Sequence, residues 1–171
     1  MKRIIKRFLA LSLILTSLFF AVSCGDGKSD IIKYSESGLN FSLPPYMEKL
    51  NVNYADICYG NLKDGTEFLV YFYSREALLT ELYLPLDATV KEYADWFVAV
   101  NGYENVEEEY SEADKKIVLK YIYEPESIYY TDTILRNEYS LIHVTMCCKT
   151  ENSEIYKPRF EEWISRLSLV Y

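Results

Sequence analysis

The sequence predicts an α+β fold, an antiparallel β-sheet with two amphipathic helices packed on it, one per face. Three observations favour this class. Several short apolar runs are joined by connections of only a few residues, which is typical of antiparallel hairpins. Two other segments repeat apolar residues with helical spacing. The strands and helices follow one another as strands, helix, strands, helix, which favours one mixed domain.

Three strands are expected in the first half of the chain. Residues Leu39 to Leu43 alternate apolar and polar side chains, and Tyr54 to Tyr59 is expected to pair with Thr66 to Ser74. The turn between the last two contains Gly65, which can adopt a positive φ. Phe68 to Tyr73 is apolar on both faces, so this strand must be covered above and below.

Two amphipathic helices can supply that cover. The first can be capped by Thr89 and ended by Gly102. The second contains Pro158, which we expect in its first turn. The apolar stripes of the two helices are Val90, Tyr93, Ala94, Phe97 and Val98, and Phe160, Trp163, Ile164 and Leu167.

Four more strands are expected between the two helices, and their short connections predict antiparallel neighbours. These strands are Val106 to Ser111, Lys116 to Tyr123, Tyr129 to Leu135 and Tyr139 to Cys148.

The N-terminus has the plan of a secretory signal peptide. Four basic residues within the first seven precede an apolar run from Phe8 to Phe20, and small residues lead into Cys24. The sequence Ala21-Val22-Ser23-Cys24 resembles the lipobox of bacterial lipoproteins, which implies that the Cys24 thiol receives a diacylglyceryl group and becomes the mature N-terminus. The alternatives are an uncleaved anchor and plain secretion. The uncharged run of 16 residues would span about 24 Å as a helix, which is short for a bilayer core of about 30 Å.

These features divide the chain into a signal peptide (1–23), a lipidated cysteine with a polar tether (24–30) and one globular domain (31–171). The expected location is the cell membrane or outer membrane, facing outside the cytoplasm and held by the lipid anchor. Loss of the signal leaves 14 basic and 26 acidic residues, a net charge of −12. Without a basic cluster beyond the signal, nucleic-acid binding is not expected.

Three further cysteines allow one disulfide in an exported protein. Cys147 and Cys148 are adjacent on a strand and point to opposite faces, so neither bonds the other without distortion. Cys58 can bond to one of them if their strands are neighbours; the alternative is three buried thiols. A metal is not expected, because the cysteines lack zinc-type spacing and His143 lies about 13 Å along the strand from Cys147.

No catalytic motif is present. Gly60 to Thr66 has the outer glycine spacing of a phosphate loop but lacks its lysine and leads into a strand, so it predicts a hairpin turn. The acidic group Glu107 to Glu109, with Glu112 and Asp114, is either a solvated hairpin or a weak Ca²⁺ site. We therefore expect no enzyme activity and no cofactor.

The 17 tyrosines are the unusual feature of the composition. One interpretation is that tyrosine fills a half-covered sheet. The other is a partly exposed aromatic surface for a protein partner, or for a carbohydrate that stacks on the rings. The candidate residues for that surface are Tyr71, Tyr73, Tyr121, Tyr123, Tyr129 and Tyr130.

From Tyr34 to Val170 the pattern resembles the PsbP/DcrB family. The likeness rests on Gly38 to Pro44, with its Phe-Ser-Leu-Pro ending, on the order of helices and strands, and on the closing Phe160-x-x-Trp163-Ile164 helix. It implies an α/β/α sandwich that serves as a binding or assembly module and supplies no catalytic residues. The family includes photosystem subunits and many envelope lipoproteins of unknown role.

The sequence as a whole predicts a lipid-anchored, extracytoplasmic, non-catalytic module that binds or assembles a protein partner at the envelope. The alternative is an envelope lipoprotein that binds a small ligand or a divalent cation.

Overall fold

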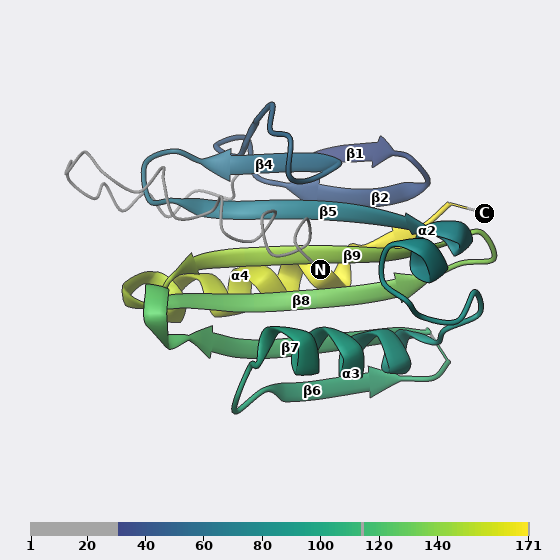
Figure 1. The fold of residues 1–171 in the computed structure, drawn as a ribbon. Helices are drawn as coiled ribbons and strands as arrows, with labels where there is room; N and C mark the ends of the chain where they lie inside the picture. Colours follow the sequence, from purple (N-terminus) through teal and green to yellow (C-terminus); the bar gives the residue numbers. More distant parts are fainter. Residues whose placement is uncertain (1–30, 114, 171) are drawn as a thin grey trace.

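The computed structural model describes residues 31–113 and 115–170, which form two antiparallel sheets and the helices packed on them (Figure 1). In spatial order the strands of the large sheet are β3 (Glu48–Lys49), β4 (Ile57–Asn61), β5 (Thr66–Ser74), β9 (Ser140–Lys149), β8 (Ile128–Arg136), β7 (Lys116–Tyr123) and β6 (Glu107–Ser111). The small sheet contains β1 (Ile32–Glu36), β2 (Leu39–Leu43) and β10 (Ser168–Leu169).

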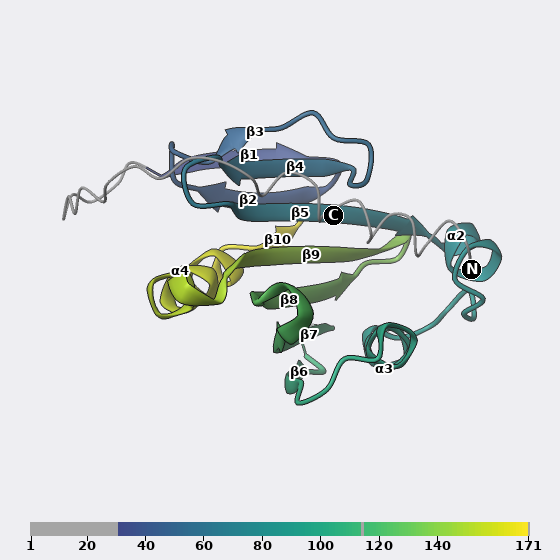
Figure 2. The ribbon, with the colours of Figure 1, turned by 60° about the vertical axis from the view of Figure 1, so that its left-hand side comes forward.

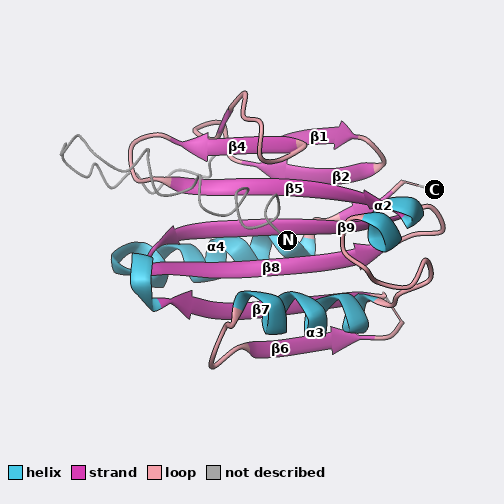
Figure 3. Ribbon diagram, viewed as in Figure 1, coloured by secondary structure: helices cyan, strands magenta, loops and turns pink. Residues whose placement is uncertain are grey.

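The helices lie on both faces of the large sheet (Figures 2 and 3). They are α2 (Arg75–Thr80), α3 (Val90–Asn101) and α4 (Ser153–Ser165), with 3-10 turns η2 (Glu124–Glu126) and η3 (Thr150–Asn152). One face packs against α4 and the small sheet, and the other against α2 and α3. The predicted fold class, with one amphipathic helix per face, is therefore confirmed. Among the described residues, no helix has the length and apolar character needed to cross a bilayer.

Side-chain alternation along the central strands explains this two-sided core. On β9, Ile142, Val144 and Met146 pack in the α4 cluster, whereas Leu141 and Cys147 pack in the α3 cluster. Because neighbouring residues of a strand point to opposite faces, a strand that is apolar throughout needs a layer on each side. β5 and β9 lie at the centre of the sheet, where a packed layer covers each face.

The predicted caps of α3 are confirmed. Thr89 and Glu92 form a reciprocal capping box at the start of the helix. Gly102 ends the helix with a left-handed φ of 66°, which a residue without a Cβ adopts at little cost. In the β4–β5 turn, Gly65 has the expected positive φ of 73°.

The prediction for Pro158 was wrong. Helix α4 begins at Ser153, so Pro158 is its sixth residue and lies inside the helix rather than in its first turn. Proline there cannot donate to the carbonyl of Glu154. The buried stripe of Tyr156, Phe160 and Trp163 continues across this position and holds α4 on the sheet.

Three short strands, β1, β3 and β10, the short helix α2 and the two 3-10 turns were not predicted. The Leu39 to Leu43 strand was expected, but it pairs with β1 and β10 in a separate sheet instead of joining the large one. Its residues Leu39, Phe41 and Leu43 are fully buried against the large sheet.

Candidate functional site

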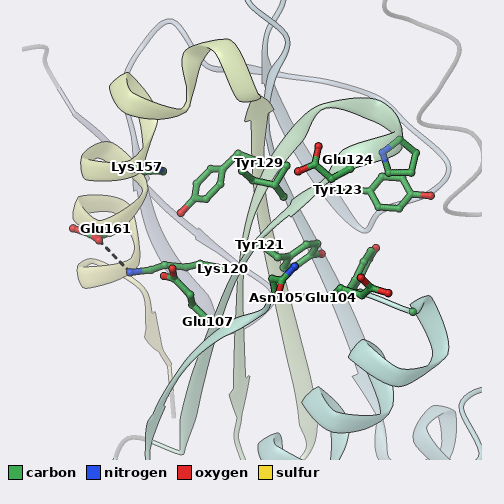
Figure 4. Close-up of a pocket in the computed structure, with 14 residues that line it drawn as sticks. Glu104, Asn105, Glu107, Lys120, Tyr121, Tyr123, Glu124, Tyr129, Lys157 and Glu161 are labelled. Atoms are coloured by element: carbon green, nitrogen blue, oxygen red, sulfur yellow. Dashed lines mark hydrogen bonds and ion pairs between the residues drawn. The ribbon is translucent and has the colours of Figure 1, made fainter.

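An open cleft of about 520 Å³ lies at one end of the large sheet, where β7 extends past β6 (Figure 4). Its walls come from the loop after α3, from the end of β7 with the following 3-10 turn, and from α4. A volume of this size is in the range of sites for small molecules or peptide side chains.

The cleft opens along the edge of a strand. Pairing between β6 and β7 ends at Glu107 and Lys120, yet β7 continues to Tyr123. Tyr121, Ile122 and Tyr123 all line the cleft, although consecutive side chains point to opposite faces of a sheet. The cleft therefore faces the edge of β7 and receives side chains from both faces.

Two lysines of the cleft are already neutralised by ion pairs. Lys120 Nζ lies 2.8 Å from Glu109 and 3.1 Å from Glu161. Lys157 Nζ lies 2.8 Å from Glu154 and 5.4 Å from the centre of the Tyr129 ring. These contacts raise the pKa of both lysines, chiefly through the hydrogen bonds to Glu109 and Glu154.

Three carboxylates of the cleft have no such close partner. The side chains of Glu104, Glu107 and Glu124 make no hydrogen bond or salt bridge with the residues that the structure describes, although Glu107 acts on Lys157 at longer range. Figure 4 shows Glu104 and Glu124 on the side of Tyr123, away from the pair of Lys120 and Glu161. The charge that remains free in the cleft is negative.

Tyrosine rings form the inner wall of the cleft. Tyr103 stacks on Tyr121 with ring centres 4.3 Å apart, and Tyr123 meets Tyr103 edge-on at 5.9 Å. Burial is the main cause that raises the pKa of Tyr103 and of Tyr121. Both phenols are therefore neutral at physiological pH and act as flat, uncharged surfaces with a polar tip.

Behind this wall lies a buried polar network centred on Asp132. Its Oδ2 accepts a hydrogen bond of 2.7 Å from the Tyr121 hydroxyl, and its Oδ1 accepts one of 2.5 Å from Thr145. His143 Nε2 lies 2.9 Å from the same Oδ1, and His143 Nδ1 lies 2.9 Å from the hydroxyl of Tyr93. Each side-chain polar atom of this network has a partner, as buried groups require.

The network has the groups of an acid–base relay but lies inside the core. Asp132 is 0% exposed and His143 is 1% exposed, with the rings of Tyr93 and Phe97 packed against the imidazole. A general base must come within hydrogen-bond reach of a substrate proton, and these side chains do not line the cleft. No enzyme site is evident among the described residues.

Sequence reasoning considered His143 only as a metal ligand, found its distance from Cys147 too great for that, and missed Asp132, Thr145 and Tyr93. The available signal was an aspartate between two threonines within an apolar strand, which indicates a buried polar group. Its partners could not be found from the sequence, because they depend on the register that pairs Asp132 with Thr145 on β9.

The neighbouring strands that the possible disulfide requires are not observed. β5 lies between the strand of Cys58 and that of Cys147 and Cys148, which places them about 10 Å apart across the sheet. A disulfide needs Cα atoms within about 7 Å. The three cysteines are free and buried, which agrees with the alternative interpretation of buried thiols.

The six candidate tyrosines do not form one exposed surface. Tyr121, Tyr129 and Tyr130 are buried, and Tyr129 lies on the α4 face whereas the other two lie on the α3 face. Tyr71, Tyr73 and Tyr123 are half-buried. In the cleft the structure brings together Tyr121, Tyr123 and Tyr129, and Tyr103 joins them there. Tyr130 stacks on Tyr121 inside the core but does not line the cleft.

Other candidates are separated or lie outside the described part. The signal peptide and Cys24 fall on residues 1–30, and Asp114 is also outside the described residues. In the acidic hairpin, Glu108 pairs with Lys91 and Glu109 with Lys120. Among residues 31–113 and 115–170, no three histidine, cysteine or carboxylate side chains are placed to hold a metal ion.

The arrangement of sheet and helices defines a PsbP-like α+β fold. Cyanobacterial PsbP (CyanoP) from Synechocystis sp. PCC 6803 has a similar solution structure, with a TM-score of 0.60 and 18% sequence identity. The match covers 86% of this chain and 98% of that protein. At this identity the likeness establishes the fold, and function must come from the site.

A weaker likeness connects the chain with PA94 from Pseudomonas aeruginosa, a protein of unknown function described as a putative regulator. The TM-score is 0.44 at 10% identity, with 81% of this chain and 96% of that protein covered. No protein-family model matches the sequence, and no curated protein matches it.

Proposed function

We propose that this protein is a lipid-anchored, extracytoplasmic module that binds a protein partner at the cell envelope and catalyses no reaction itself. One observation carries the binding role: the cluster with acid–base groups is sealed in the core, while the open cleft presents tyrosine rings and unpaired carboxylates. Such a surface suits recognition better than chemistry, because tyrosine is enriched at interfaces and the cleft contains no activated nucleophile.

The anchoring role rests on the sequence around Cys24. Only residues 25–31 separate Cys24 from the start of β1 at Ile32. Even fully extended, seven residues reach at most about 25 Å. A lipid on Cys24 would thus hold the domain beside the membrane, where two acyl chains give stable anchoring.

Site-specific photo-crosslinking in intact cells tests the binding role. A photoreactive amino acid replaces Glu104 or Ile122 in the cleft and, as the matched control, Leu62 in the β4–β5 turn, which is 72% exposed. We expect a discrete adduct of one partner from both cleft positions and none from position 62. The proposal is contradicted if the membrane-bound protein forms no adduct from either cleft position. It is also contradicted if all three positions give the same adducts.

A second candidate function is the binding of a small molecule, and the volume of the cleft favours it. It predicts that a soluble ligand raises the melting temperature of the purified protein. It also predicts that Tyr103→Ala removes this rise while Tyr139→Ala, at a position 78% exposed, preserves it. A flat thermal-shift profile across sugars, amines and peptides would count against it.

A further inference from the structure

We propose that the cleft binds an extended, basic segment of the protein partner, which pairs as an additional strand with the free edge of β7. This inference rests on the proposed partner-binding function and specifies the chemistry of the partner.

The first step is the free edge. Tyr121, Ile122 and Tyr123 pair with β8 on one side, at Tyr130, Tyr129 and Ile128. On the other side, the ladder with β6 has already ended at Lys120. An edge segment with one side unpaired is a template for an incoming strand.

The backbone before β6 keeps this edge open. Asn105 has a left-handed φ of 53°, so the chain turns just before β6 starts at Glu107. The preceding residues Gly102 to Asn105 form the opposite wall of the cleft and do not continue the β6 ladder along Tyr121 to Tyr123. The cleft thus separates this loop from the strand edge, which leaves room for an extended chain.

The second observation is the charge of the side chains that line the cleft. The two lysines of the cleft are held in ion pairs, whereas the carboxylates of Glu104, Glu107 and Glu124 form no salt bridge with described residues, and Glu107 interacts with Lys157 only at longer range. These carboxylates surround the end of β7 from the loop, from β6 and from the 3-10 turn. Arginine or lysine side chains projecting from a bound strand would lie among them, and the net charge of the domain favours the approach of a basic partner.

The third step is the aromatic lining. The cleft already places one cation, Lys157, over the ring of Tyr129 at 5.4 Å. Tyr103 and Tyr123 are only half-buried, so parts of their rings remain accessible to a guanidinium group. A strand that alternates basic and apolar residues fits both the carboxylates and the rings.

The probe for the test is a fluorescent seven-residue peptide, blocked at both ends, in which arginine and valine alternate. Two matched peptides accompany it: one has glutamate in place of arginine, and one has the arginine sequence with alternate backbone nitrogens methylated. Methylation keeps the charge but removes the N–H donors that a strand needs. Binding is measured by fluorescence anisotropy on the purified full chain in a non-ionic detergent.

We expect the arginine peptide to bind, the other two to bind at least tenfold more weakly, and added salt to weaken binding. On binding, amide hydrogen exchange in Tyr121 to Tyr123 should slow. The double variant Glu104→Gln/Glu124→Gln should lose about threefold in affinity per carboxylate, whereas the control Glu138→Gln/Glu151→Gln, outside the cleft, should bind like wild type.

Equal binding of the methylated peptide would overturn strand addition, and equal binding of the acidic peptide or of the cleft variant would overturn charge recognition. Absence of binding by the arginine peptide would overturn the inference. If cleft positions 104 and 122 still crosslink to a partner in cells, the proposed function would stand and only this description of its partner would fail.

Discussion

Replacement of Asp132 by alanine should be among the most destabilising single changes in the domain. The carboxylate is 0% exposed and accepts hydrogen bonds from Tyr121, Thr145 and His143. Its removal deprives three buried donors of their shared acceptor, and a buried hydrogen bond lost in this way costs about 1–3 kcal/mol; the contacts of Thr145 with His143 and of Tyr121 with Tyr103 remain. A water molecule can enter the vacated space and accept some of these hydrogen bonds. We therefore expect the free energy of unfolding to fall by about 4 kcal/mol.

This loss can be measured by urea unfolding of the full chain in non-ionic detergent, followed by far-UV circular dichroism. At about 3 °C per kcal/mol for a domain of this size, the melting temperature should fall by roughly 12 °C. Asp132→Asn keeps the shape but turns one acceptor into a donor, so it should lose about 2 kcal/mol.

Asp95→Ala is the matched control, because Asp95 is exposed and pairs only with Lys91. It should change stability by less than about 0.5 kcal/mol. If Asp132→Ala unfolds within about 1 kcal/mol of wild type, the buried hydrogen bonds to Asp132 do not stabilise the sheet as inferred from their burial.

Two other predictions concern buried ionisable groups. Burial raises the pKa of Glu67 above 4.5, and its Oε2 has no hydrogen-bond partner. The folded state therefore holds this proton more tightly than the unfolded state, and stability falls as the pH rises from 4.5 through the folded-state pKa. Glu67→Gln should stabilise the protein by about 1 kcal/mol at pH 7 and have no effect below about pH 4; equal effects at both pH values would refute this. Burial also raises the pKa of Cys58 and Cys148 to about 12, and that of Cys147 well above its usual value. Ellman's reagent at pH 8 should detect none of these thiols in the native protein and all of them after unfolding. If two fewer thiols react in denaturant without reductant than with it, two of the cysteines form a disulfide and the prediction is wrong.

The extent of the central elements could be predicted from the sequence because their signals are local. Lys116–Tyr123 and Thr66–Ser74 have the predicted bounds, since each is a long apolar run between polar turns. Thr89 and Gly102 mark the ends of α3 because capping depends on residues within one turn.

The remaining features depend on contacts between distant residues. β10 has two residues and exists because it pairs with Asn40 and Leu39, far away in the chain. The unequal lengths of β6 and β7, which create the cleft, follow from their register. Whether a tyrosine is buried also depends on which face a helix covers: Tyr121 was a candidate for exposure but lies under α3 and Tyr103.

The most direct test of the account is the mass of the mature N-terminal peptide, measured on protein isolated from membranes of the native host. We predict that the chain begins at Cys24 and carries the added mass of a diacylglyceryl group on its sulfur, and that Cys24→Ala abolishes both processing and membrane retention while Cys58→Ala preserves them. A chain that begins at Met1 with an unmodified Cys24 thiol, recovered outside the membrane fraction, would contradict the account.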